Sequence, residues 1–410
     1  TYVGGKISPE MECPKLLWLK ENHKTSWKQA KKFIDLADYM VFRATGCDSR
    51  SLCTSVCKWT YLGQEGLSGG YRRDFFQEIG LSDLFDRNLV PENVFPMGFN
   101  AGGLTKEAAR EWGLEPGTPV GVGIIDAHAG GVGSLSIGSA DADSFEQSLA
   151  LIGGTSSCHM AVSVAPRFIP GIWGPYYGAM IPGMWLNEGG QSATGALIDY
   201  AIRNTASYAK IKSAAKAEGI DPYTFLNREI SILKKKDGLK IVEDLHILPY
   251  HHGNRSPRAD ARATGMVSGL TLGETIKDAA LIYYATLQAI AYGTRHIIES
   301  MNEKGYRINK IHLSGGHLKN RLLIQETADI TGCEITLPRE PEAVLLGSAI
   351  LGAVAAGECA SISDGIKAMV HSAGTIRPDT GTISFHTAKY GIFKEMYACQ
   401  KRSREKMKNI

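Results

Sequence analysis

The 410-residue chain lacks any apolar run long enough to cross a membrane. Its longest apolar stretches, such as Ala349–Ala356, are far shorter than the roughly 20 residues that a membrane-spanning helix needs. The chain also lacks an excess of charge of one sign, because 45 Lys and Arg residues against 42 Asp and Glu residues leave a net charge of +3. So small a charge gives no reason to expect nucleic acid or an acidic membrane surface as a partner. We therefore expect a globular protein that binds neither.

Cysteines are few, and they are scattered along a chain that is long enough to build a core without disulfides. Only Cys53 and Cys57 among the eight lie close together. This CxxxC pair has no second pair and no histidine near it in the sequence, so it is a weak signal for a metal site. The cysteine pattern favours a reduced, cytoplasmic protein, and no metal ligand is predicted.

Several familiar catalytic signatures are absent as well. The sequence contains no GxxxxGK[ST], GxGxxG, HExxH or GxSxG motif. Without them, P-loop NTPases, Rossmann dehydrogenases, zincins and α/β-hydrolases lose their main support.

The patterns that are present alternate between strand and helix. The apolar run 120–125 follows a Pro-Gly turn and is typical of a strand covered on both faces. Thr271 and Glu274 form a capping-box pattern, which predicts the start of a long buried helix ending near Glu303. After it, strand and helix patterns alternate with short loops up to residue 357. This order favours α/β layers with some parallel strand pairing, followed by a basic, solvated C-terminal helix over 384–410.

Four glycine-rich turns lie at predicted strand ends: around Asp126, at 153–156, at 189–195 and at 315–316. The second joins two strands of a predicted hairpin within 148–163. Glycine lets a backbone approach a ligand closely, and free N–H groups at turns and helix starts bind anions. One such turn means little, but four in an α/β chain suggest a ligand rich in phosphate, most simply a nucleotide.

Asp126 lies directly after the apolar run 120–125 and directly before a stretch of small residues. One interpretation is a helix N-cap, which is common for an aspartate that opens a helix. The other is a general base at the edge of a sheet where α/β folds bind ligands, accepting the proton of a hydroxyl that attacks phosphorus. The local pattern favours neither.

Other reactive side chains are weaker candidates. His128 starts a predicted helix and is a minor catalytic candidate beside its expected packing role. His251 and His252 have no partner at metal-ligand spacing, so a surface or structural role is favoured. Cys158 has no neighbouring His or Asp that would make it a nucleophile, and it is interpreted as a small residue within a strand.

Taken together and in order, six sequence segments resemble the FGGY family of carbohydrate kinases, most closely its ribulokinase-like branch. The segments are IIDAHAG, GGTSSCHM, EGGQSATG, GNRSPRAD, SGGHLKNRLL and EPEAVLLGSAILGA. The resemblance extends from the first residues to about residue 400. It implies two actin-like, ribonuclease H-like α/β domains with the active site in the cleft between them. It also implies that ATP, with a divalent metal that is usually Mg²⁺, phosphorylates a terminal hydroxyl of a sugar.

The resemblance divides the chain into three parts. Residues 1–147 correspond to the later portion of the family's N-terminal, sugar-binding domain. Residues 148–357 correspond to the C-terminal, nucleotide-binding domain, and residues 358–410 form a C-terminal helical segment. A homodimer is left open as the oligomeric state.

The resemblance also assigns roles to individual residues. Asp126 matches the general base, and Lys58 and Glu188 match the pair that binds sugar hydroxyls. The residues that match the nucleotide site are Gly154, Thr155 and Ser156 at the β- and γ-phosphates, Gly195 and Asp199 beside the ribose and adenine, and Gly315, Gly316 and Asn320 in the adenosine motif.

The chain departs from the family pattern at its start. It contains neither the DxGT phosphate loop nor the Trp-x-Asp-x-Arg sugar motif that begin family members. The sequence is therefore interpreted as an incomplete piece of an active kinase or as a truncated product that is inactive alone. D-ribulose phosphorylated at O5 is the preferred substrate, with L-ribulose, xylulose and ribitol left open. The alternatives are an inactive nucleotide-binding protein with a regulatory role and an actin- or chaperone-like ATPase.

Overall fold

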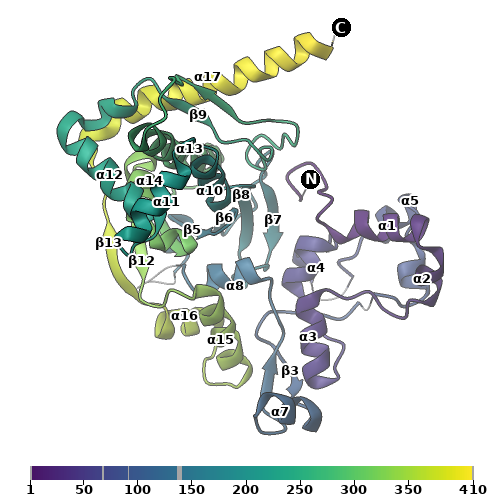
Figure 1. Cartoon of the computed structure of the whole chain (residues 1–410). Coiled ribbons are helices and arrows are strands. Elements are labelled where there is room, and N and C mark those ends of the chain that lie inside the picture. The colour runs from purple at the N-terminus through teal and green to yellow at the C-terminus, as the bar shows by residue number, and fades with distance from the viewer. Residues whose placement is uncertain (1, 67–68, 91, 136–140, 409–410) are drawn as a thin grey trace.

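A mixed seven-stranded sheet forms the centre of the molecule (Figure 1). The computed structural model describes residues 2–66, 69–90, 92–135 and 141–408. The sheet has the order β13-β12-β11-β5-β6-β8-β7. Its strands are β5 (Ser148–Gly153), β6 (Ser157–Ser163), β7 (Trp173–Tyr177), β8 (Trp185–Gln191), β11 (Lys310–Gly315), β12 (Glu334–Pro338) and β13 (Ser372–Ile376). Because β11 pairs in parallel with both β5 and β12, the predicted α/β layering with some parallel pairing is confirmed.

The structure also contains helices and two-stranded ribbons, and in Figure 1 those of the first part of the chain lie to one side of the sheet. The ribbons are β1 (Arg50–Ser51) with β2 (Val94–Phe95), β3 (Asn100–Gly103) with β4 (Pro119–Gly121), and β9 (His246–Leu248) with β10 (Met266–Ser268). The helices up to the sheet are α1 (Glu12–Asn22), α2 (Lys24–Gln29), α3 (Leu36–Thr45), α4 (Leu52–Lys58), α5 (Arg73–Glu78), α6 (Asp83–Asp86), α7 (Lys106–Trp112), α8 (Asp126–Val132) and α9 (Ala142–Glu146). The later helices are α10 (Gly195–Arg203), α11 (Tyr208–Ala217), α12 (Pro222–Asp237), α13 (Ile276–Asn302), α14 (Arg321–Thr331), α15 (Ala343–Ala355), α16 (Ile362–Met369) and α17 (Ile383–Lys408).

Alternation along β5 explains why both faces of the sheet are covered. Leu149 and Leu151 pack in one apolar cluster with residues of α13 and α14. Ala150, between them, packs in another cluster with residues of α8, α15 and α16. Successive strand residues point to opposite faces, so one apolar strand supports a helical layer on each side.

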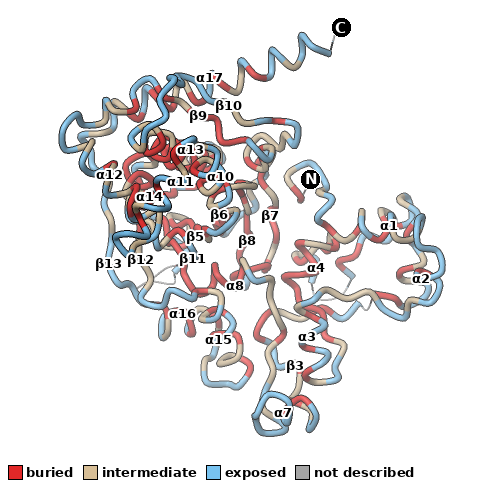
Figure 2. The backbone as a smooth tube through the Cα atoms, viewed as in Figure 1, coloured by how far each residue is buried: buried red, intermediate tan, exposed pale blue. Residues whose placement is uncertain are grey.

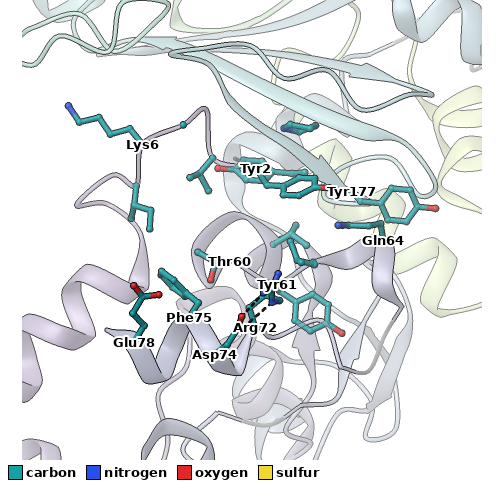
Figure 3. A pocket seen from close by; sticks show the side chains of 17 residues that line it. Tyr2, Lys6, Thr60, Tyr61, Gln64, Arg72, Asp74, Phe75, Glu78 and Tyr177 are labelled. Carbon is teal, nitrogen blue, oxygen red and sulfur yellow. Dashed lines mark hydrogen bonds and ion pairs between the residues drawn. The ribbon is translucent and has the colours of Figure 1, made fainter. Parts of the chain in front are cut away.

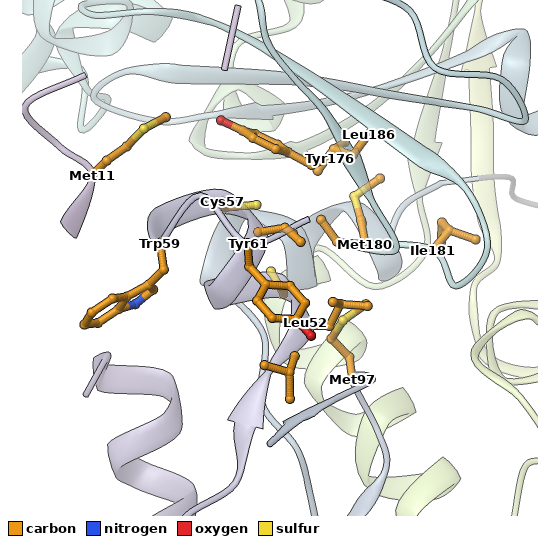
Figure 4. Packing of buried hydrophobic residues seen from close by; sticks show 14 of the residues in the cluster. Met11, Leu52, Cys57, Trp59, Tyr61, Met97, Tyr176, Met180, Ile181 and Leu186 are labelled. Carbon is orange, nitrogen blue, oxygen red and sulfur yellow. The ribbon is translucent and has the colours of Figure 1, made fainter. Parts of the chain in front are cut away.

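The second of these clusters is the largest core of the molecule, and Figure 4 shows part of it. Leu52 and Met97 come from the first part of the chain, whereas Met180 and Leu186 come from beyond residue 147. Ile350 of α15 packs in the same cluster. Residues on both sides of the predicted boundary at 147 and 148 therefore share one core, and the boundary itself stays a prediction.

The predicted strand at 120–125 is wrong in extent and in surroundings. Only β4 (Pro119–Gly121) is a strand, and it is an exposed to half-buried partner of β3. A Cβ at Gly121 would lie 3.0 Å from the carbonyl oxygen of Leu351, and one at Gly123 would lie 3.3 Å from that of Ala37. The segment thus runs close against α15 and α3, where it has no room to be sandwiched in a sheet.

Two other details of the sequence pattern are corrected. The capping box of α13 is formed by Thr275 and Asp278, not by Thr271 and Glu274. A helix begun at Thr271 would place Gly273 in its first turn, which is unfavourable. Helix α17 is present as predicted, but it is not solvated on all sides, since Tyr390 and Phe393 are buried against other helices; its C-terminal end is mostly exposed (Figure 2). Among the described residues, no helix has both the length and the apolar character that crossing a membrane requires.

A buried carboxyl group in α3 makes stability depend on pH. Burial raises the pKa of Asp38 to about 7, although hydrogen bonds from the Ser51 N–H group and the Thr54 hydroxyl lower it again. Between pH 4 and pH 7 the unfolded chain has lost this proton while the folded chain retains it. Folding stability from this group therefore falls as the pH rises through that window.

We expect Asp38→Asn to remove this contribution, because an amide does not titrate. The melting temperature of the variant, measured from pH 4 to pH 7, should fall less steeply with rising pH than that of the parent chain. Asp86→Asn, at an exposed position, is the control and should leave the slope unchanged. Parallel curves for Asp38→Asn and the parent would contradict the assignment.

Candidate active site

The glycine turn of the β5–β6 hairpin is the centre of the predicted nucleotide site. The hairpin forms as predicted, with residues 154–156 in its turn. The start of α10 lies directly on this turn. The Thr194 N–H group donates to the Thr155 carbonyl at 2.9 Å, and the Gly195 N–H group donates to the Gly154 carbonyl at 3.0 Å. The loop at 189–195 and the hairpin turn are therefore one structural unit.

The glycine turn at 315–316 adjoins the same unit from the other side. Gly315, the last residue of β11, is the parallel partner of Gly153. His317 lies over Gly153, where an added Cβ would overlap its ring, and its Nε2 atom is 3.2 Å from the hydroxyl of Thr194. Three of the four glycine-rich turns thus meet at one end of β5 and β11.

The hairpin turn offers unused hydrogen-bond donors. The N–H groups and hydroxyls of Thr155 and Ser156 make no hydrogen bond with any described residue. Gly154 and Thr155 are exposed. Free, adjacent N–H groups at an exposed turn are the arrangement that binds phosphate oxygens. This turn therefore fits the phosphates of a nucleotide.

The glycines of the predicted site divide into two kinds. A Cβ at Gly195 would lie 2.6 Å from the Gly154 carbonyl oxygen, and one at Gly315 would lie 2.6 Å from the Gly153 carbonyl oxygen. These two glycines are required by the packing of the turns. At Gly154 and Gly316, by contrast, the nearest atom would be 3.8 Å and 3.6 Å away. The space beside Gly154 and Gly316 is open to a ligand.

Two other predicted nucleotide residues already hold structural contacts. Asn320 caps α14 through the Leu323 N–H group, and its amide donates to the hydroxyl of Tyr283 at 2.8 Å. Asp199 forms an ion pair with Arg203 at 2.9 Å on α10. Both side chains are half-buried. Their positions are fixed before a ligand binds, and their roles toward a nucleotide stay predictions.

Asp126 is the first residue of α8, and its side chain is exposed. The cap position of this helix belongs to Ile125, so the N-cap interpretation of Asp126 is wrong. One carboxylate oxygen accepts from the Ala127 N–H group at 2.7 Å. No described residue donates to the other oxygen, which is therefore available to accept a proton.

Lys58 and Glu188, predicted as a pair, line the same cavity. This cavity of about 40 Å³ also includes His128 and the residues on either side of Asp126. Lys58 ends α4, and no described residue forms a hydrogen bond or ion pair with its ammonium group. The Glu188 side chain, on β8, is 11% exposed. The structure thus brings the ammonium group of Lys58, which no described residue pairs with, and the carboxylate of Glu188 together next to the start of α8.

His128 has a larger place in this site than the sequence suggested. Its side chain is only 1% exposed. Its Nε2 atom is 3.1 Å from a Glu188 oxygen and its Nδ1 atom is 3.0 Å from the Cys53 sulfur. Burial disfavours charge on all three groups. Attraction to Cys53 and Glu188 nevertheless raises the pKa of His128, His128 lowers the pKa of Glu188, and a hydrogen bond with Cys57 together with the charge of His128 lowers the pKa of Cys53. In the sequence, the signal that could have indicated this role was the position of His128 two residues after Asp126, on the same short helix.

Cys158 connects the sugar side of the site to the hairpin turn. It lies on β6, just beyond Ser156, and is a strand residue as predicted. Burial raises the pKa of its thiol to about 12, and the negative charges of Glu188 and Asp126 contribute to the shift. The charges of Glu188 and Asp126 thus both reach this thiol, which lies two residues beyond Ser156.

A larger cavity of about 720 Å³ opens beside the hairpin turn. Ser156, Trp173 and the loop 251–255 line it on one side, and residues 6–10 line it on the other. Arg255, which the sequence did not single out, packs on the ring of Trp173 and forms an ion pair with Glu10 at 3.2 Å. His251 and His252 are lining residues of this cavity.

A separate cavity of about 580 Å³ lies between the N-terminal segment and the region around α5 (Figure 3). Tyr2, Thr60 and Tyr177 are among its lining residues. It contains none of the predicted site residues, so the chemistry is assigned to the two other cavities, beside α8 and beside the hairpin turn.

Comparison with protein-family models finds two matches. The N-terminal domain of the FGGY family of carbohydrate kinases matches residues 2–133, and its C-terminal domain matches residues 149–356. The chain belongs to the FGGY family of carbohydrate kinases. Sequence relatives agree: an FGGY carbohydrate kinase domain-containing protein of Xenopus laevis is 46% identical over 98% of this chain and 74% of its own length.

Two further comparisons place this FGGY kinase among sugar kinases. A D-ribulokinase of Saccharomyces cerevisiae is 38% identical over 86% of this chain and 54% of its own length. The crystal structure of a gluconate kinase from Lactobacillus acidophilus superimposes with a TM-score of 0.79 at 20% identity, over 99% of this chain and 75% of that one. The predicted family and the two-domain sugar kinase fold are thereby confirmed.

Family membership makes the chain a carbohydrate kinase, a phosphotransferase that uses an alcohol group as acceptor. Sugar kinases of the FGGY family use ATP, generally with Mg²⁺. The free donors of the hairpin turn and the open space at Gly154 suit the phosphates of such a nucleotide.

Proposed function

We propose that this FGGY kinase transfers the γ-phosphate of ATP to the terminal hydroxyl of a ketopentose, with D-ribulose, phosphorylated at O5, as the preferred substrate. The similarity to the yeast D-ribulokinase supports the choice of sugar. The observation that carries the proposal is the convergence of Lys58, Glu188 and α8 on one cavity, beside a turn with unused N–H donors.

The nucleotide side of the site positions the phosphates. The N–H groups of Thr155 and Ser156 donate to oxygens of the β- and γ-phosphates, and the exposed backbone at Gly316 lies against the adenosine. When bound, a magnesium ion would supply charge that offsets part of the negative charge of the phosphates. Positioning and charge stabilisation carry most of the catalysis in phosphoryl transfer, so a rigid turn is suited to this role.

The sugar side prepares the attacking hydroxyl. Lys58 donates to one sugar oxygen, and the Glu188 oxygen that does not face His128 accepts from another hydroxyl. The free carboxylate oxygen of Asp126 takes the proton of the terminal sugar hydroxyl. At the same time, the oxygen of that hydroxyl forms its bond to the γ-phosphorus. The bond between that phosphorus and the β–γ bridging oxygen breaks, and ADP leaves with the electron pair.

The proposal is tested with the full-length enzyme, ATP and a panel of pentuloses and pentitols. We expect D-ribulose to give the highest kcat/KM, with a 5-phosphate as the product. A preference for xylulose or ribitol would overturn the assigned sugar. ATP hydrolysis that does not depend on sugar would indicate an actin- or chaperone-like ATPase, and nucleotide binding without turnover would indicate an inactive relative.

Gly316→Val tests the adenosine contact. An added Cβ has 3.6 Å to the nearest protein atom, so the chain should fold normally while the side chain fills space that the nucleotide needs. We expect the apparent KM for ATP to rise about tenfold or more, with the KM for sugar nearly unchanged. Initial-rate kinetics at varied ATP and varied sugar measure both. An equal rise in the two constants would disprove the contact.

A further inference from the structure

Three potential metal ligands meet beneath the sugar side of the site. Cys53 and Cys57 on α4 and His128 on α8 are all buried, and their ligand atoms lie within 4.8 Å of one another. The two cysteines are four residues apart on one helix, so they share a face. The sequence hid this cluster because His128 is 75 residues away from Cys53.

The two ring nitrogens of His128 have the kinds of neighbour that a metal-binding histidine has. Its Nδ1 atom faces the Cys53 sulfur at 3.0 Å, and its Nε2 atom faces the Glu188 carboxylate at 3.1 Å. Histidines that bind metals almost always donate their other N–H group to a carboxylate, a carbonyl or water, which fixes the tautomer and the ring orientation. Glu188 provides that carboxylate here.

We propose that the sulfur atoms of Cys53 and Cys57 and the Nδ1 atom of His128 bind one Zn²⁺ ion. Two thiolates and an imidazole are a ligand set that selects zinc over magnesium, because magnesium prefers oxygen ligands. Three protein ligands leave a fourth tetrahedral position, as in zinc sites that keep an open coordination position. Cys57 and His128 both line the cavity of about 40 Å³ beside α8, which gives space for a water molecule at that position.

A disulfide between the two cysteines is the competing use of the same residues. Cβ atoms four residues apart on a helix are about 5–6 Å apart, whereas a disulfide needs about 3.5–4.5 Å. Forming it would distort α4, whose residues from Leu52 to Cys57 are all buried. A metal ion joins the two sulfurs without that movement.

Metal titration of the full chain tests the proposal without ATP or sugar, so its result is independent of the proposed function. The reduced protein, stripped with a chelator, is titrated with Zn²⁺ against a chromophoric competitor and separately with Co²⁺. We expect one equivalent of each, and thiolate-to-metal charge-transfer absorption with Co²⁺. Cys53→Ser and Cys57→Ser should each weaken binding by more than about 100-fold, beyond the roughly 10–100-fold typical for loss of a ligand's hydrogen-bond partner.

Two further variants keep the test decisive. Cys13→Ser removes a buried cysteine of the same region outside the cluster and should bind one equivalent as the parent does. Glu188→Gln retains all three ligands and should weaken binding about 10–100-fold, even where a cysteine variant fails to fold. Absence of stoichiometric binding, equal loss in Cys13→Ser, or a Cys53–Cys57 disulfide in the air-exposed chain would overturn the proposal.

Discussion

Asp126→Asn is expected to lower the turnover of the full-length enzyme at least about 10²-fold while its affinity for ATP stays nearly unchanged. The amide retains the size of the side chain and can still accept from the Ala127 N–H group, as the carboxylate does. It cannot take up the proton of the attacking hydroxyl. The loss should therefore appear in kcat, since the phosphate contacts of the hairpin turn are made by other residues.

Steady-state kinetics and nucleotide binding by calorimetry separate these two effects. The matched control is Asp364→Asn, which changes a carboxylate in the first turn of α16 that bonds to the hydroxyl of Ser361. Its turnover should equal that of the parent enzyme. Near-normal turnover of Asp126→Asn would show that this carboxylate is not the base.

Gly347→Ala is expected to destabilise the protein by about 3 kcal/mol or more, beyond the usual cost of an overpacked core. An added Cβ at Gly347 would overlap the carbonyl oxygen of Ala129, and one at Gly133 would overlap that of Ala343. Helices α8 and α15 thus pack backbone to backbone. A backbone atom cannot move out of the way by a change of rotamer, as a flexible side chain can. To make room, α8 must shift and carry Asp126 with it.

The same helix supplies the control for this prediction. Gly352 also lies within α15, but an added Cβ there has no atom within 4 Å. Gly352→Ala should therefore stabilise the protein by roughly 0.5–1 kcal/mol, the usual gain for alanine over glycine in a helix. Thermal unfolding of both variants measures the contrast. Equal melting temperatures would contradict the close packing of α8 and α15.

Local patterns were the predictable part of this fold. The hairpin at 148–163 and its glycine turn follow from strand and turn signals within sixteen consecutive residues, and they form as expected. The limits of β4 were not predictable, because they depend on the approach of α15 from more than two hundred residues later in the chain. Helix α17 shows the same dependence: its basic end suggested a solvated helix, while Tyr390 and Phe393 pack on distant helices.

The candidate site, too, was predictable from the sequence only where short motifs mark it. Asp126 and the hairpin turn are marked by short motifs, and the position of Glu188 came from the resemblance to known kinases. The contact between His128 and Glu188 joins residues 60 positions apart, and no short pattern records it. Side-chain partners across such distances are set by how helices dock on the sheet, which a single sequence does not specify.

The docking of α15 on α8 also bears on biosynthesis. Chains fold as they emerge from the ribosome at about 5–20 residues per second, N-terminal parts first. Helix α8 leaves early, and Met160 and Met180 lie against its Gly131, but its contact through Ala129 and Gly133 is with α15, which is made much later. Arrest of translation before residue 343 would therefore release a polypeptide in which α8 lacks its contact with α15.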